Sequence, residues 1–170
     1  MSVRQRLFRL LLWISVLTWT TWIGGTLYQV VVIVPIWSAS LPHNLHVLFH
    51  DLQPNLSDTA RNFFGPSWTL PRYLPPVLAL GVGWSMTTHR RWLLVTAVCA
   101  VIIVASTFLY VYPINAVLFF APARGSQSPE ELRALAEHWI MVDRIRYAVG
   151  VLGFCALLRA FSLPVTEGVR

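Results

Sequence analysis

The stretch SPEELRALAEHWIMVDRIRYAVGVLGFCALL, residues 128–158, decides the fold class of this 170-residue chain. Ser128 can accept hydrogen bonds from the free N–H groups of a first helical turn, and Pro129 suits the first helical position. The two glutamates that follow favour the positive end of the helix dipole. The next proline is Pro164, so the sequence predicts one helix of roughly 35 residues, about 50 Å long. This helix begins among polar residues and ends among apolar ones, which indicates that it enters a membrane.

The composition is typical of an integral membrane protein. Hydrophobic residues make up 56% of the chain and charged residues 12%, whereas a soluble domain has about a quarter charged residues. The formal net charge of +6 arises from arginines, because the chain has no lysine, and this excludes lysine chemistry such as a Schiff base. In a membrane protein a basic balance is first a topology signal. We therefore expect the lipid bilayer as a partner and no nucleic acid.

Four apolar runs predict an all-α fold, an integral membrane four-helix bundle that forms a single domain over residues 1–170. The spans are expected at about 10–37, 74–88, 92–112 and 139–161. Arginines precede the first run, separate the second from the third and follow the fourth, so the positive-inside rule puts both termini in the cytoplasm. We expect a bacterial plasma membrane protein, and the sequence leaves open whether it is a homo-oligomer. The pair Gly24-Gly25 predicts a kink or a close helix contact in the first span.

The loop between the first two runs is expected to have a structure of its own. Within residues 43–52, the apolar side chains share one helical face, and His43, His46 and His50 share the opposite face. Together with His138, these histidines are weak candidates for a metal or haem site, because imidazole is a common metal ligand. The alternative is a short interfacial helix with its histidines in water. Ligands at i and i+7 of a straight helix lie about 10 Å apart, so we favour the alternative and expect no metal.

Polar residues of three spans are predicted to meet in the outer half of the bundle. They are Gln29 in the first span, Tyr112 and Asn115 at the end of the third, and Trp139, Asp143, Arg146 and Tyr147 in the fourth. Along the last helix, Trp139, Asp143 and Arg146 form one stripe, in which the acid and the arginine can pair at i, i+3. Charged groups at membrane depth are costly unless they pair or face a polar cavity. This stripe is therefore the candidate functional site.

Structural interpretations of the same residues stay open. Asp143 and Arg146 could form an ion pair that serves stability alone, with Arg144 reaching toward the lipid headgroups. Asn115 could cap the end of a helix that is broken by the proline two residues before it.

Two short motifs lie in this polar region: PINAVL at residues 113–118, and Trp139 followed by Asp143-x-x-Arg146. The first looks like the Pro-x-Asn-x-x-Leu signature of the anthrone oxygenase-like family of small four-helix membrane proteins. The second resembles the Trp and Asn-x-x-Arg of that family, with Asp143 where the family often has Asn. The glycine pair and Pro35 of the first run are also similar to the family's first helix, which contains glycine and ends near a proline.

The resemblance implies an oxygenase that works without flavin, haem or metal. Fungal members convert anthrones, which are electron-rich fused phenols, to anthraquinones with O₂. By this resemblance Asp143 or a loop histidine is the candidate base, and Arg146 and Asn115 stabilise the oxyanion. The candidate residues for binding the flat, hydrophobic substrate are Gln29, Tyr112, Trp139 and Tyr147.

Two other functions stay open. The chain could be a non-catalytic binding or accessory subunit that holds a lipid, a quinone or a partner helix in the same outer cavity. It could also hold a metal or haem through its histidines. A Rossmann glycine fingerprint, a P-loop and a Gly-x-Ser-x-Gly elbow are absent from the sequence, which fits a protein that needs few cofactors.

Overall fold

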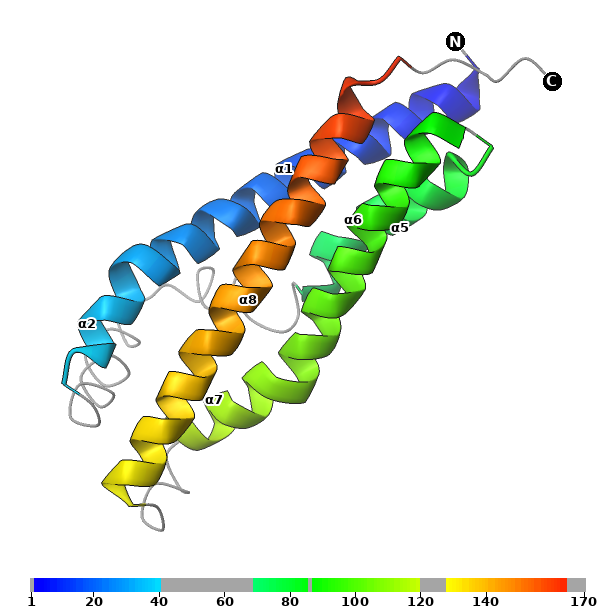
Figure 1. Ribbon diagram of the computed structural model, residues 1–170. Coiled ribbons are helices and arrows are strands. Elements are labelled where there is room, and N and C mark those ends of the chain that lie inside the picture. Colours follow the sequence, from blue (N-terminus) through cyan, green and yellow to red (C-terminus); the bar gives the residue numbers. More distant parts are fainter. Residues whose placement is uncertain (1, 41–68, 86, 120–127, 165–170) are drawn as a thin grey trace.

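The computed structural model describes residues 2–40, 69–85, 87–119 and 128–164, and within these ranges the chain is helical without strands (Figure 1). The predicted all-α helical bundle is therefore confirmed. The loop segment with His43, His46 and His50 lies outside the described residues, so its amphipathic helix and its metal-binding role stay predictions.

The long helix at the end of the chain is α8, Pro129–Ser162, with 34 residues. Its N-terminus is closed by a capping box. The Ser128 hydroxyl accepts from the backbone N–H of Glu131 at 3.2 Å, and the Glu131 carboxylate accepts from the backbone N–H of Ser128 at 2.8 Å. The helix ends two residues before Pro164, because the residue that precedes a proline avoids the helical conformation.

The first and third helical stretches each contain a π-helical turn. The first consists of α1 (Val3–Tyr28), η1 (Gln29–Ile33) and α2 (Val34–Ser38). The third consists of α6 (Thr87–Ser106), η5 (Thr107–Val111) and α7 (Tyr112–Phe119). Each π turn ends two residues before a proline, Pro35 or Pro113, which cannot donate the backbone hydrogen bond of a regular α-helix. The wider π turn accommodates the missing backbone N–H of the proline. Such turns are frequent at functional sites.

The structure shows no close helix contact at Gly24, and the predicted kink at Gly24-Gly25 stays a prediction. α1 runs through both residues, and a Cβ added to Gly24 would meet nothing within 4 Å. Two glycines of α8 do make close contacts with α1. A Cβ added to Gly153 would lie 2.6 Å from the Trp19 ring, and one added to Gly150 would overlap the Trp22 ring. These two glycines let α1 approach α8 with its tryptophans between the helices.

The second helix, α5 (Thr69–Val82), has 14 residues and begins and ends earlier than the predicted span. A turn after it leads into α6. Three helical stretches are long and apolar enough to cross a membrane: Val3–Ile36, His89–Asn115 and Pro129–Ser162. A bilayer crossing takes about 20 residues, and α5 falls short of this length. A crossing by the second helix therefore stays a prediction, whereas the membrane-spanning character of the chain follows from the other three.

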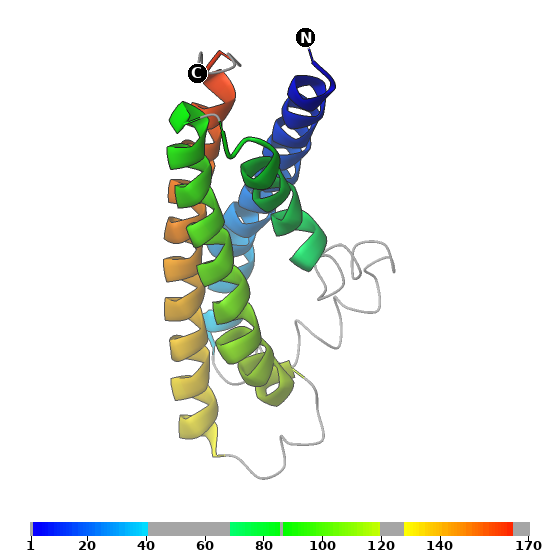
Figure 2. The same cartoon turned by 90° about the vertical axis from the view of Figure 1, so that its right-hand side faces the viewer.

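The helices pack with α8 along α6 and α1, while α5 lies against α1 and α6 (Figures 1 and 2). The start of α1, the α5–α6 turn and the end of α8 share one end of the bundle. The end of α2, the end of α7 and the start of α8 lie toward the other (Figure 1). This arrangement agrees with the topology predicted from the arginines. Which side of a membrane each end faces stays a prediction.

Two apolar clusters fill the interior. The larger one is centred on α1, α5, α6 and the second half of α8, and it includes Phe8, Trp19, Trp22, Tyr73 and Leu157. The smaller one joins α2, α7 and the first half of α8, and it includes Val34, Ile114, Leu118, Ala136 and Trp139. Large apolar side chains also cover much of the outer surface, as lipid contact requires. On α8 the polar stripe continues from the smaller cluster toward the larger one.

Candidate functional site

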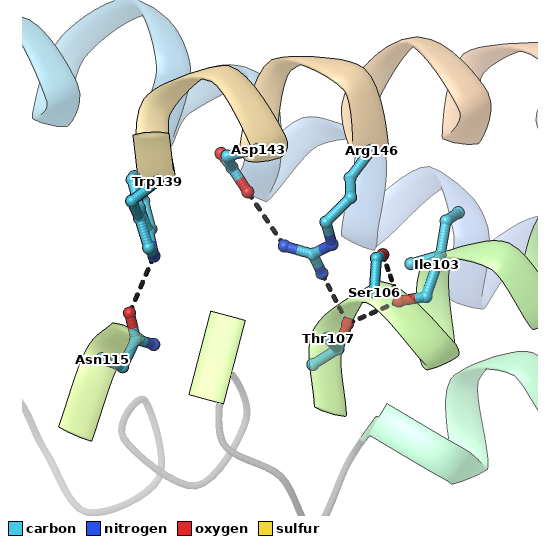
Figure 3. Close-up of polar contacts among 7 residues, drawn as sticks. All are labelled: Ile103, Ser106, Thr107, Asn115, Trp139, Asp143 and Arg146. Carbon is cyan, nitrogen blue, oxygen red and sulfur yellow. Dashed lines mark hydrogen bonds and ion pairs between the residues drawn. The ribbon is translucent and has the colours of Figure 1, made fainter. Parts of the chain in front are cut away.

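Asp143 and Arg146 form a buried ion pair near the middle of α8. Arg146 donates from Nη1 to Oδ1 of Asp143 at 3.0 Å, and only 12% and 5% of the two side chains are exposed, respectively (Figure 3). The predicted pairing at i, i+3 is thus confirmed. Both side chains point from α8 toward the third helical stretch, where an apolar surrounding strengthens their attraction.

Thr107 of η5 holds the other end of the guanidinium. Arg146 donates from Nη2 to the Thr107 hydroxyl at 2.8 Å, and this hydroxyl donates to the backbone carbonyl of Ile103 at 2.7 Å (Figure 3). The Ser106 hydroxyl donates to the same carbonyl at 2.9 Å. The position of Arg146 is therefore set by two helices. The sequence analysis missed Thr107, although a hydroxyl six residues before Pro113 is the available signal.

Asn115 and Trp139 join the ends of the third and fourth helical stretches. The indole Nε1–H of Trp139 donates to Oδ1 of Asn115 at 2.7 Å (Figure 3). This bond turns the amide so that its NH₂ group faces away from the indole, where it can serve as a donor. Asn115 lies inside α7, at its fourth residue, so the interpretation of Asn115 as a helix cap is wrong. The Asn115–Trp139 bond lies next to the ion pair, because Trp139 precedes Asp143 by about one turn on the same face of α8 (Figure 3). Asn115 itself does not bond to the ion pair.

Two atoms of the ion pair are buried and make no hydrogen bond within the described part of the chain: Oδ2 of Asp143 and Nε of Arg146. Buried polar atoms in proteins are nearly always paired, and an unpaired one costs about 1–3 kcal/mol. One acceptor of Asp143 and one donor of Arg146 are therefore available to a ligand that brings a proton and an oxygen.

The remaining predicted residues differ in their burial and in their contacts. The Tyr112 ring lies edge-on to that of Phe108, with centroids 5.2 Å apart. Gln29 and Tyr147 are partly buried, and among the described residues neither side chain is hydrogen-bonded to the ion pair. His138 is exposed, with its ring 6.5 Å from that of Tyr110. Within the described ranges, no group of three His, Cys, Asp or Glu could hold a metal ion.

Arg72 and Tyr73, near the start of α5, are two buried residues that the sequence analysis did not consider. Only 8% and 5% of their surfaces are exposed. Tyr73 is close enough to both Arg146 and Arg72 to interact with them electrostatically. Because the predicted second span begins at residue 74, the prediction assigned both residues to the loop before it. The signal was an arginine at the border of an apolar run, which is the criterion that singled out the stripe on α8.

Comparison with known proteins identifies one family. The model of the family described as Anthrone oxygenase matches residues 68–156, more than half of the chain. The match covers PINAVL and the stretch from Trp139 to Arg146, which confirms the resemblance based on these motifs. It does not extend to the glycines and proline of the first helix. Searches of curated proteins and of solved structures found no match.

Proposed function

Because the chain belongs to the anthrone oxygenase family, we propose that it is a small membrane oxygenase that converts a hydrophobic anthrone-type substrate to a quinone with O₂. One substrate and one O₂ give one quinone and one water. The observation that carries the proposal is the state of Asp143: Arg146 holds Oδ1, while Oδ2 is buried and without a hydrogen bond in the described residues.

Asp143 acts first, as the general base. Its Oδ2 takes a proton from the acidic CH₂ group of the anthrone, and the electron pair of the broken C–H bond enters the ring system as an enolate. The enolate oxygen needs hydrogen-bond donors as its charge develops. The proposed donors are Nε of Arg146, which has no partner among the described residues, and the NH₂ group of Asn115, whose amide oxygen accepts from Trp139.

The enolate then reduces O₂ without help from another redox group. One electron passes to O₂, and the two radicals combine to form a C–O bond at the deprotonated carbon. Asp143 returns its proton to the resulting peroxide. The remaining proton on that carbon leaves, the O–O bond breaks with loss of water, and the carbon becomes the second carbonyl. All electrons come from the substrate, so the reaction requires only a base, oxyanion donors and a site that excludes water.

The aromatic residues around the ion pair are proposed to hold the flat substrate. Trp139 is the strongest of them, because its bond to Asn115 fixes the indole plane. Gln29, Tyr112 and Tyr147 are proposed as further contacts on the basis of their partial burial. We also propose that the arginine-rich end of the bundle faces the cytoplasm of a bacterial cell, in line with the positive-inside rule.

The test uses membranes that contain the full chain, an anthrone and O₂, with quinone formation followed by absorbance. We expect Arg146→Ala to lose the activity and Arg144→Ala to keep it, because Arg144 is two residues away and exposed. If the unchanged chain forms no more quinone than Arg146→Ala does, the proposal is wrong.

A second function is supported by the same unpaired atoms, since they would also suit a ligand that is bound and not converted. The chain would then be a binding or accessory subunit for a quinone or a lipid. Extraction of the purified protein and mass spectrometry of the extract tests this. A stoichiometric quinone or lipid that is absent from Arg146→Ala would favour binding over catalysis.

A further inference from the structure

Tyr73 of α5 is held inside the bundle by α1. Its ring lies edge-on to two tryptophans of that helix, with centroids 5.7 Å from Trp19 and 6.0 Å from Trp22. The Thr18 hydroxyl also donates to the backbone carbonyl of Arg72 at 3.4 Å, which ties α5 to α1 at this level. The position of the Tyr73 ring is therefore set by side chains of α1.

The same ring lies beside the turn of α8 that carries Arg146. Trp22, which contacts Tyr73, packs on Gly150. Gly150 follows Arg146 by four residues, so the two are adjacent on one face of the helix. Tyr73 also lies within electrostatic range of Arg146, in agreement with this placement. The phenol of α5 thus extends the polar stripe of α8.

Tyr73 is 5% exposed, and the hydroxyl of a buried tyrosine usually finds a hydrogen-bond partner. The indole Nε1 of Trp19, which is fully buried, has no partner among the described residues. Together with Nε of Arg146, this gives two buried donors without acceptors in the described residues, one of them on a ring that contacts Tyr73, whereas Oδ2 of Asp143 is the unmatched acceptor. A ligand that fits this set carries oxygens that accept hydrogen bonds and one acidic hydrogen.

We infer that Tyr73 is a further substrate-binding residue, which donates a hydrogen bond from its hydroxyl to a carbonyl or phenolic oxygen of an aromatic substrate. The inference rests on the proposed function, because it takes an anthrone-type ketone as the ligand. One oxygen of the substrate faces Tyr73, and its acidic carbon faces Asp143. A hydrocarbon chain of a lipid would leave the indole N–H of Trp19 and Nε of Arg146 unpaired and is disfavoured at this position.

The experiment compares Tyr73→Phe, which removes only the hydroxyl, with Tyr28→Phe, the same change at a side chain that is 58% exposed. Anthrone is dialysed without oxygen against the purified full chain in detergent, so that binding is measured without turnover. We expect Tyr73→Phe to bind anthrone about tenfold more weakly, which corresponds to the loss of one hydrogen bond. Tyr28→Phe should bind it like the unchanged chain. Thermal midpoints of the three proteins check that the ring packing survives.

The outcomes separate this inference from the proposed function. The inference is supported if Tyr73→Phe binds anthrone more weakly than the unchanged chain and Tyr28→Phe does not. This holds even if the unchanged chain binds anthrone without forming quinone, a result that would contradict only the proposed function. Equal binding by the unchanged chain and Tyr73→Phe overturns the inference and leaves the oxygenase proposal standing if quinone is formed. Absence of anthrone binding by the unchanged chain overturns both.

Discussion

Arg146 donates to Asp143 across 3.0 Å from one turn further along the same helix, and the pair lies in an apolar bundle. The two charges neutralise each other there, and each would be costly alone. The pair also leaves one carboxylate oxygen and one guanidinium N–H without a partner among the described residues. An ion pair that only stabilised the fold would contribute more stability if these two atoms were hydrogen-bonded. Their lack of a partner among the described residues therefore favours a functional role for the pair.

Removal of one partner of the pair should cost more than removal of both. Asp143→Leu and Arg146→Leu each leave a buried charge without its partner, at about 3–5 kcal/mol, whereas the double variant leaves an apolar contact. Thermal midpoints of the four proteins in detergent measure the coupling. The exposed pair Arg133–Glu137, with side chains 68% and 62% accessible, provides the control and should show coupling below about 1 kcal/mol. Additive losses at 143 and 146 would mean that the two side chains do not interact.

The Thr107 hydroxyl should be needed for activity because it fixes the guanidinium of Arg146. Thr107→Val keeps the shape of the side chain but removes the acceptor at 2.8 Å, and we expect the rate of quinone formation to fall about tenfold. Thr107→Ser keeps the hydroxyl and should retain most of the rate. A rate for Thr107→Val equal to that of the unchanged chain would exclude a positioning role for Thr107.

Gly150 should not tolerate even one added methyl group. Gly150→Ala would drive a Cβ into the Trp22 ring, so α1 and α8 would have to separate, and we expect a clear drop of the thermal midpoint. Gly24→Ala is the matched control, because a Cβ there meets nothing within 4 Å. This second change should raise the midpoint slightly, since alanine favours a helix by about 1 kcal/mol over glycine. Equal midpoints for the two variants would contradict the close packing of the helices.

The capping box at Ser128 should contribute to the stability of α8. Ser128→Ala removes the acceptor for the Glu131 N–H and should cost about 1 kcal/mol. Ser128→Asp offers another good capping oxygen and should cost little. Thermal midpoints again give the measurement, and hydrogen exchange of the first turn of α8 localises the effect. Unchanged exchange in Ser128→Ala would show that the cap does not hold this turn.

The helix boundaries show where sequence patterns succeed and where they fail. The capping signal at Ser128 and the stop at Pro164 are local, and α8 begins and ends close to them. The second helix was predicted less well. Its Pro75 and Pro76 lie inside α5 instead of near its first turn, because packing against α1 and α6 stabilises a helix that the prolines disfavour.

The sequence by itself determined the four-helix fold class, the membrane character and the pairing of Asp143 with Arg146. These follow from apolar runs and from the spacing of residues on a single helix. Only the tertiary structure decided which residues of other helices lie near that pair: Thr107 accepts from Arg146, Tyr73 lies within electrostatic range of Arg146, and Asn115 accepts from Trp139 on the same helix as the pair. Contacts between helices depend on how each helix is rotated about its axis and how far it slides along its neighbour. The glycines of α8, the tryptophans of α1 and the π turn before Pro113 set those quantities together, and no single segment of the chain encodes them.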